Sequence, residues 1–239
     1  MSVCPLQALE RESLDHVDTA KRLGYGFFSD ACKLIWLCST SLTGKSGDAM
    51  REFLDMPAMK HFAIPHKMYL YAILGDYEHG AEEALQTGDE YSKSFVGALF
   101  GLEPFYRGLT LYVMARRTGK TDYKAAAAKI LKQLQTWATK KGCVNLVGPA
   151  HLLSAEDAAL HGKKQHVCAS LFEDAILVSS RDGFLQNSGL ANERYADYLL
   201  ELDDTDAARF RINQAIDCYS RWGASHKVEM LQQRLSTLS

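Results

Sequence analysis

The segment from Ser39 to Ser46, STSLTGKS, comes closest in spacing to a catalytic motif. A phosphate-binding loop of the form G-x-x-x-x-G-K-[ST] uses its glycines to let the backbone wrap the phosphates, and its lysine to contact them. Gly44, Lys45 and Ser46 fit that form, but Ser39 stands where the first glycine belongs. The residues before Ser39 continue a helical pattern, and no apolar strand ending in aspartate follows to hold magnesium. A turn between helices is favoured, and a nucleotide-binding enzyme or switch that uses Gly44-Lys45-Ser46 is the alternative function.

The histidines and acidic residues lack the spacing of a metal site. The closest groupings are His61 with His66, His161 with His166, and Asp203 with Asp204 and Asp206. Two ligands on one helix face are four residues apart, whereas these histidines are five apart. A calcium loop needs a glycine at its sixth position and a glutamate at its twelfth. No serine or cysteine has the context of a nucleophile. We therefore predict no catalytic residue, no metal and no cofactor.

Four turns interrupt the helical periodicity at an almost constant interval. They lie at Gly75, Gly119, Gly162 and Asp204, separated by 44, 43 and 42 residues. A repeat of this length is one helix, a tight turn and a second helix. Such a hairpin cannot bury its apolar face alone, so neighbouring hairpins stack and share a core. The pattern predicts an all-α fold, a right-handed α-solenoid of antiparallel helix hairpins with about 11–12 helices.

The periodicity also predicts where each helix lies. We expect helices over residues 5–23, 26–42, 46–56, 60–74, 77–88, 94–117, 121–140, 146–161, 164–182, 184–202, 205–221 and 223–238. Each turn glycine should take the left-handed conformation that ends a helix, and Thr205 or a neighbouring aspartate should cap the helix that follows it. The small pair Gly80-Ala81 should let two helices approach closely. The aromatic residues at helical spacing should be core, namely Phe100, Phe105, Tyr106 and Tyr112.

The chain is expected to form a single domain, residues 1–239. Residues 1–57 fit the repeat least well and are expected to form an irregular hairpin with a short helix. Residues 58–222 should hold four hairpins of about 43 residues, and residues 223–239 a helix that caps the stack. Trp222 should be buried between the last hairpin and the side chains of Val228, Leu231 and Leu235 in that final helix.

Composition limits the class of protein. Hydrophobic residues make up 47% and charged residues 23%, which is typical of a folded globular chain. The net charge of −2 offers no electrostatic attraction to nucleic acid or anionic lipid. Six scattered cysteines without a C-x-x-C pair indicate thiols in a reducing compartment. The N-terminus lacks the pattern of a signal peptide, and charges interrupt the most apolar stretch. We expect a cytoplasmic protein that binds neither nucleic acid nor membrane.

Several segments carry a resemblance to known repeat proteins. The sequence LGDYEHGA from Leu74 to Ala81 resembles the turn of a tetratricopeptide repeat (TPR). The segments DGFL (182–185), LANERYA (190–196) and YSRWGASHKV (219–228), in that order, resemble the helical-repeat part of large signalling proteins. In that family this part follows a STAND-type ATPase module and precedes a GAF sensor and a histidine kinase. The resemblance covers about residues 94–235 and implies a TPR-like regulatory segment that binds protein without catalysis of its own.

A partner-binding groove is the functional surface that this architecture favours. In hairpin solenoids the first helix of each pair lines the concave surface. If the four turns are equivalent, the outward face of these helices includes Tyr69, Arg116, Glu156, Arg194 and Tyr198. Such a mixed row is typical of a peptide groove, but any solvated helix face shows the same mixture, and the solvated face is the favoured interpretation.

The expected function is therefore a non-enzymatic protein–protein interaction or regulatory scaffold in intracellular signal transduction. Its partner would be a protein or peptide, or the flanking domains of a larger signalling protein. A further possibility is an intramolecular spacer that transmits conformational change and has no separate partner.

Overall fold

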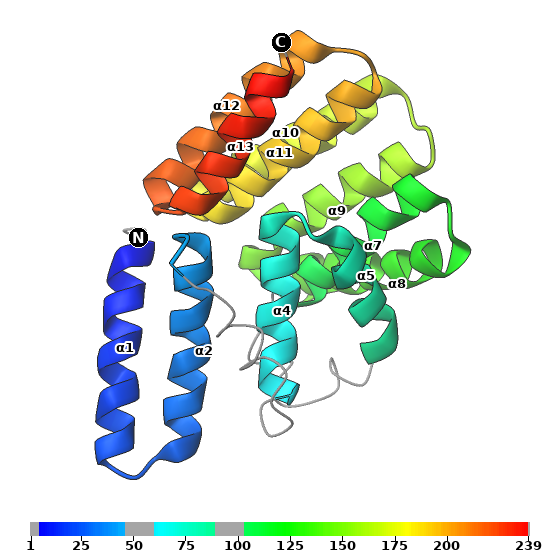
Figure 1. Cartoon of the computed structure of the whole chain (residues 1–239). Helices are drawn as coiled ribbons and strands as arrows, with labels where there is room; N and C mark the ends of the chain where they lie inside the picture. The colour runs from blue at the N-terminus through cyan, green and yellow to red at the C-terminus, as the bar shows by residue number, and fades with distance from the viewer. Residues whose placement is uncertain (1–4, 46–59, 89–102, 239) are drawn as a thin grey trace.

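The computed structural model describes residues 5–45, 60–88 and 103–238. Within these ranges the chain forms eleven α-helices and one short 3₁₀ turn, and no strand (Figure 1). The all-α prediction is confirmed. No helix among the described residues is both long and apolar enough to cross a bilayer.

The helices follow one another with short connections. Their bounds are α1 Leu6–Arg22, α2 Gly26–Leu42, α4 Lys60–Leu74, α5 Tyr77–Thr87, α7 Glu103–Thr118, α8 Thr121–Lys140, η3 Val144–Leu146, α9 Val147–Leu160, α10 Gln165–Arg181, α11 Leu185–Glu201, α12 Thr205–Trp222 and α13 Ser225–Thr237. Most of these bounds lie within two residues of those expected from the periodicity. The helix expected over 46–56 lies outside the described residues, as does the first part of the one expected over 94–117.

Consecutive helices pack as hairpins, and the hairpins pack on one another. The paired helices are α1 with α2, α4 with α5, α7 with α8, α9 with α10, and α11 with α12. The first helices of the last four pairs also touch in order, since α4 contacts α7, α7 contacts α9, and α9 contacts α11 (Figure 1). The final helix, α13, packs on α12.

The turns have the chemistry that the sequence predicts. Gly75, Gly119 and Gly162 have φ angles of +81°, +71° and +60°, the left-handed region that closes a helix end. Asp203 takes the same conformation, with φ +59°, where a side chain other than glycine is uncommon. The neighbouring Asp204 carboxylate accepts a hydrogen bond from the Ala207 amide at 3.1 Å and caps α12.

Helix α7 lies at the centre of the fold. Every residue from Glu103 to Ala115 is buried, because α4, α5, α8 and α9 all pack against this helix. A glycine is needed at position 80 of α5, where this helix contacts α7, since a Cβ there would lie 2.7 Å from the Thr110 methyl group. Phe105, Tyr106 and Tyr112 are buried as expected, whereas Phe100 lies outside the described residues.

The N-terminal hairpin reaches the last turn of the chain. Helix α2 contacts both α4 and α13. The Gln7 amide donates a hydrogen bond to the Gly223 carbonyl at 3.3 Å, and the Ser225 hydroxyl donates one to the Thr43 carbonyl at 3.2 Å. In Figure 1 the upper ends of α1 and α2 accordingly lie below the α12–α13 turn. Segments more than 180 residues apart in sequence are thus in direct contact.

Trp222 is buried, with 6% of its surface exposed, as the sequence predicts. Its indole lies edge-on to the Tyr69 ring of α4, with centroids 6.4 Å apart, and 6.3 Å from the Tyr219 ring. Trp222 therefore joins the last hairpin to α4, a contact that the sequence did not indicate.

We expect Trp222→Ala to lower the free energy of unfolding by about 3 kcal/mol, near the lower end for tryptophan truncation. The lower end applies because one side of the indole borders a cavity and makes fewer contacts there. Denaturant unfolding measures the loss. Phe210→Ala in the same helix is the control, since Phe210 is 57% exposed and should lose less than about 1 kcal/mol. Equal losses in the two variants would contradict this packing.

Candidate functional site

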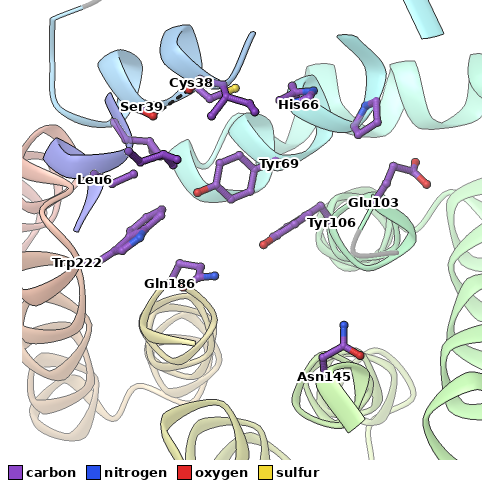
Figure 2. A pocket seen from close by; sticks show the side chains of 14 residues that line it. Leu6, Cys38, Ser39, His66, Tyr69, Glu103, Tyr106, Asn145, Gln186 and Trp222 are labelled. Carbon is purple, nitrogen blue, oxygen red and sulfur yellow. Dashed lines mark hydrogen bonds between the residues drawn. The ribbon is translucent and has the colours of Figure 1, made fainter. Parts of the chain in front are cut away.

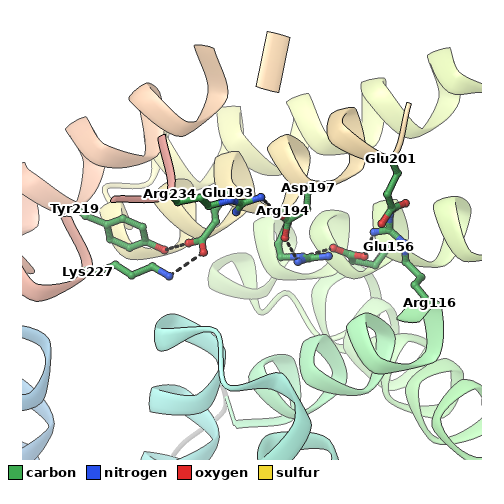
Figure 3. Close-up of polar contacts among 9 residues, drawn as sticks. All are labelled: Arg116, Glu156, Glu193, Arg194, Asp197, Glu201, Tyr219, Lys227 and Arg234. Carbon is green, nitrogen blue, oxygen red and sulfur yellow. Dashed lines mark hydrogen bonds and ion pairs between the residues drawn. The ribbon is translucent and has the colours of Figure 1, made fainter. Parts of the chain in front are cut away.

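A buried carboxylate connects three of the stacked first helices. Glu156 of α9 has no exposed surface. Its two oxygens accept hydrogen bonds from Arg116 Nη1 of α7 at 2.5 Å and from Arg194 Nε of α11 at 2.7 Å. Figure 3 shows both guanidinium groups directed at this carboxylate. Each residue comes from a different hairpin, so the interaction exists only once the hairpins have packed.

The charged side chains continue on both sides of Glu156. Arg194 also pairs with Asp197, which in turn pairs with Arg234 of α13. Arg116 pairs with Glu201 at the end of α11. Asp197 and Glu201 lie on one face of α11 because they are four residues apart. We call these six residues the ion network; its members are Arg116, Glu156, Arg194, Asp197, Glu201 and Arg234.

A second buried ion pair joins α11 to α13. Lys227 Nζ of α13 is 2.8 Å from a Glu193 oxygen, and the Tyr219 hydroxyl donates to the other oxygen at 3.4 Å. Lys227 is only 2% exposed. A buried ammonium group requires such a partner, because burying an unpaired charge carries a large desolvation penalty.

The ion network keeps Glu156 and Asp197 ionised. Burial alone raises the pKa of Glu156, but the charges of Arg194 and Arg116 outweigh it and hold the pKa below its ordinary value. The same balance of burial against Arg194 and Arg234 lowers the pKa of Asp197. For Arg194, burial lowers the pKa, while Glu156 and Asp197 raise it well above its ordinary value.

A small pocket of about 210 Å³ opens beside the ion network. Its charged lining consists of Arg116, Arg117, Arg194, Asp197, Glu201 and Arg234. Arg117 is exposed and has no carboxylate within 4.0 Å among the described residues. Glu156 lies behind this lining. With Glu156 included, the described residues of the site are four arginines and three carboxylates, so this surface carries one surplus positive charge. We call it the arginine pocket.

The Tyr77 ring lies next to two of these cations. The guanidinium groups of Arg117 and Arg194 each lie 5.3 Å from the centre of its ring. At this distance the negative face of the ring attracts a cation. The Tyr77 hydroxyl is buried and has no hydrogen-bond partner in the described part of the chain.

The structure brings together three of the five residues expected in the groove. Arg116, Glu156 and Arg194 meet in the ion network, and the Arg116 guanidinium lies 5.8 Å from the centre of the Tyr198 ring. Tyr69 lies apart, on α4, against Tyr106 at a centroid distance of 5.1 Å.

The outward orientation expected for these side chains was wrong. Glu156 is 0% exposed, Arg194 2% and Tyr198 6%. The first helices contact one another, and Arg234 of α13 pairs with Asp197, so the face expected to meet solvent is packed instead. Whether these residues bind a partner is a separate matter, and that role stays a prediction.

Four charged residues of this site were not anticipated: Arg117, Asp197, Glu201 and Arg234. The spacing of Arg194, Asp197 and Glu201 on α11 contained a usable signal, because residues three and four apart share a helix face. Arg234 had no such signal. It lies 37 residues from Asp197 and meets it only through the packing of α13.

A larger space lies between the N-terminal hairpin and the rest of the chain. This central cavity has a volume of about 480 Å³. Figure 2 shows the rings of Tyr69, Tyr106 and Trp222 around it, with Gln186 and Asn145 on the opposite side. The apolar part of the wall comes mainly from the N-terminal hairpin and α4, through Leu6, Leu9, Ile35, Cys38, Leu42 and Pro65. The three rings come from α4, α7 and α12.

Glu103 is the one carboxylate among the described residues that line the central cavity. It is 2% exposed, and one of its oxygens lies 3.1 Å from Arg107 Nε. Neither oxygen has a hydrogen-bond partner among the described residues. Burial raises the pKa of Glu103 and the charge of Arg107 lowers it, with burial prevailing.

The segment that resembles a phosphate-binding loop ends a helix. Residues Ser39 to Leu42 belong to α2, and Gly44 follows with φ +77°. The amides of Gly44 and Lys45 donate to the carbonyls of Ser41 and Thr40 at 3.3 and 2.8 Å, so these amides close the helix. Lys45 Nζ lies 3.0 Å from both Glu10 oxygens. Ser46 lies outside the described residues.

The described part of the chain shows no group of three or more histidine, cysteine or acidic residues that could hold a metal ion. The cysteines within it are free thiols: Cys32, Cys38, Cys143, Cys168 and Cys218.

We expect Glu156→Gln to lower the free energy of unfolding at pH 7 by about 3 kcal/mol, because it leaves two buried guanidinium groups without their shared anion. Urea unfolding measures the loss. Glu173→Gln is the matched control, since Glu173 also pairs with an arginine, Arg211, but its side chain is 49% exposed. That control should lose less than about 1 kcal/mol.

The stabilisation by Glu156 should depend on pH. Its pKa is lower in the folded than in the unfolded chain, where it is about 4.3. The stabilisation is therefore complete above that value and is lost as the pH falls through the lower, folded pKa. The difference in unfolding free energy between wild type and Glu156→Gln should shrink as the pH falls from 5 to 3. A difference that grows over this range would contradict the ion network.

In comparisons with known proteins, no family model, no curated protein and no solved structure matches this chain.

Proposed function

We propose that this chain is a non-enzymatic, TPR-like α-solenoid that binds an acidic protein or peptide segment as a scaffold in intracellular signalling. Two features support the solenoid. The turns recur at intervals of 42 to 44 residues, and the first helices of consecutive hairpins contact one another in order. In solenoids this arrangement produces an extended surface to which several repeats contribute.

The arginine pocket is the observation that carries the proposal. Arginine presents a planar fork of donors that matches a carboxylate, and it is enriched among residues that dominate protein interfaces. In this pocket the ion network holds Arg116 and Arg194 in place, while Arg117 has no paired carboxylate among the described residues. An Asp or Glu side chain of a partner would supply the missing anion.

A second surface supports association with protein. At the turn between α1 and α2 four large apolar side chains are more than half exposed: Leu23, Tyr25, Phe27 and Phe28. Phe28 packs edge-on against both Tyr25 and Phe27, with centroids 6.4 and 5.8 Å apart. Apolar patches of this kind usually mark interaction surfaces. We call this patch the aromatic tip.

The resemblance of residues 94–235 to the helical-repeat part of multidomain signalling proteins supports a regulatory role in the cytoplasm. In that setting the partner is another protein or a flanking domain of the same polypeptide. Either would present acidic side chains to the same pocket.

We expect peptides selected from a random display library on the full chain to be enriched in aspartate and glutamate. Arg117→Ala should weaken the binding of such a peptide about tenfold or more, since a hydrogen bond to a charged group contributes about 1.5–3 kcal/mol. Isothermal titration at two salt concentrations measures the effect, and added salt should weaken binding further.

Lys132→Ala is the control for this experiment. Lys132 is exposed on α8 and its loss changes the net charge equally. Both variants should unfold at the wild-type midpoint. Equal weakening by the two substitutions would show that net charge, and not the arginine pocket, governs binding. If no peptide is selected, the intramolecular spacer is favoured instead.

Nucleotide binding at Gly44 and Lys45 is the competing function. We expect titration of the chain with Mg-ATP or Mg-GTP to show no saturable binding. The backbone amides that would wrap a phosphate already close α2. Lys45→Ala should also cost less than about 1 kcal/mol of stability, because the side chain of Lys45 is 58% exposed. Saturable nucleotide binding that this substitution abolishes would favour the enzyme or switch.

A further inference from the structure

We propose that the central cavity is a binding site for a small, uncharged aromatic molecule, a function beyond partner binding. Its volume of about 480 Å³ falls within the range of small-molecule sites. Elements from both ends of the chain line this space, which is partly open to solvent.

The walls favour a flat apolar body. Tyr69, Tyr106 and Trp222 surround the space, as Figure 2 shows, and Tyr69 lies edge-on to both of the other rings. Aromatic pairs prefer edge-on or offset geometry, and a ligand ring placed among these three would extend it. Leu6 and Leu9 of α1 close the same space from the N-terminal hairpin.

Polar groups on the wall are available to orient a ligand. Four side-chain groups on the wall make no hydrogen bond to another described residue. They are the Tyr69 hydroxyl, the Trp222 indole N–H and the side-chain amides of Asn145 and Gln186. Tyr106 differs, since its hydroxyl donates to Asn187 at 3.3 Å. A ligand with one or two hydrogen-bonding groups would therefore find free donors and acceptors.

The charge of the wall argues against an anion. No lysine or arginine is among the described lining residues, and Glu103 supplies a carboxylate. Among the described lining residues His66 is the one side chain that could pair with an anion, so an anionic ligand would lose its hydration for little compensation. A neutral ligand avoids this penalty.

The position of the cavity sets how a ligand would act. One wall is the N-terminal hairpin, which touches the rest of the chain through α4 and α13. A ligand in the cavity would contact α1, α2, α4, α7 and α12 together. Binding should therefore hold the hairpin against the remaining helices.

A matched pair of fluorescent probes tests the proposal. N-phenyl-1-naphthylamine is uncharged, and 1-anilinonaphthalene-8-sulfonate has the same rings with one sulfonate added. We expect the full chain to bind one molecule of the uncharged probe saturably, with a dissociation constant at least ten times lower than for the sulfonate. Equal affinities, or tighter binding of the sulfonate, would overturn the proposal.

Two substitutions that fill the cavity locate the probe. Gln186→Trp and Leu9→Trp enter from opposite walls, and each should weaken binding of the uncharged probe at least tenfold. Gln232→Trp on the exposed face of α13 is the control and should leave binding unchanged. Phe28→Ser tests the aromatic tip as the alternative location. Binding that is lost in Phe28→Ser but kept in both filled variants would overturn the proposal.

A measurement on the wild-type chain shows where the probe binds, even if the variants with a filled cavity do not fold. Cys38 lines the cavity, whereas Cys32 on the same helix does not. The rate of alkylation by N-ethylmaleimide is measured by mass spectrometry. The uncharged probe at saturation should slow the alkylation of Cys38 at least fivefold and leave the alkylation rate of Cys32 unchanged. Unchanged alkylation of Cys38 would show that the probe does not occupy the cavity.

Discussion

The packing of the central hairpins depends on the interaction of Glu156 with Arg116 and Arg194. A carboxylate with no exposed surface is stable only when it is paired and fully hydrogen-bonded, because desolvation otherwise favours its neutral form. Glu156 meets this requirement only when α7, α9 and α11 stand in one relative position. Apolar side chains tolerate some sliding between helices, whereas two charged hydrogen bonds from different helices permit little. The ion network therefore contributes geometric specificity to the hairpin stack.

Contact between the two ends of the chain is the second constraint. The N-terminal hairpin reaches the α12–α13 turn through Gln7 and Ser225. Trp222 joins α12 to Tyr69 of α4 across the same region. These contacts bring walls from distant parts of the sequence around one space, and the central cavity is the volume that their side chains leave. The fold thus produces a pocket lined by helices from both ends of the chain.

Helices α7 and α11 connect the two candidate sites, which differ in chemistry. On α7, Tyr106 faces the central cavity and Arg116 faces the arginine pocket. On α11, Gln186 faces the central cavity and Arg194 faces the arginine pocket. One end of each helix lies in an apolar, aromatic setting and the other among paired charges. If both proposals hold, a molecule in the cavity and a partner at the arginine pocket would contact the same two rigid helices.

The amino-acid sequence alone determined the all-α class, most helix bounds and the turn chemistry, because periodicity, left-handed glycines and the Asp204 cap act over a few residues. It also selected Arg116, Glu156 and Arg194 through the repeat interval, yet it assigned them to solvent. Burial of a charged side chain depends on which helix covers it, and Arg234 arrives from α13 only in the tertiary structure. The cavity had no sequence signal either. Its walls come from helices at both ends of the chain, and no local pattern encodes the space between them.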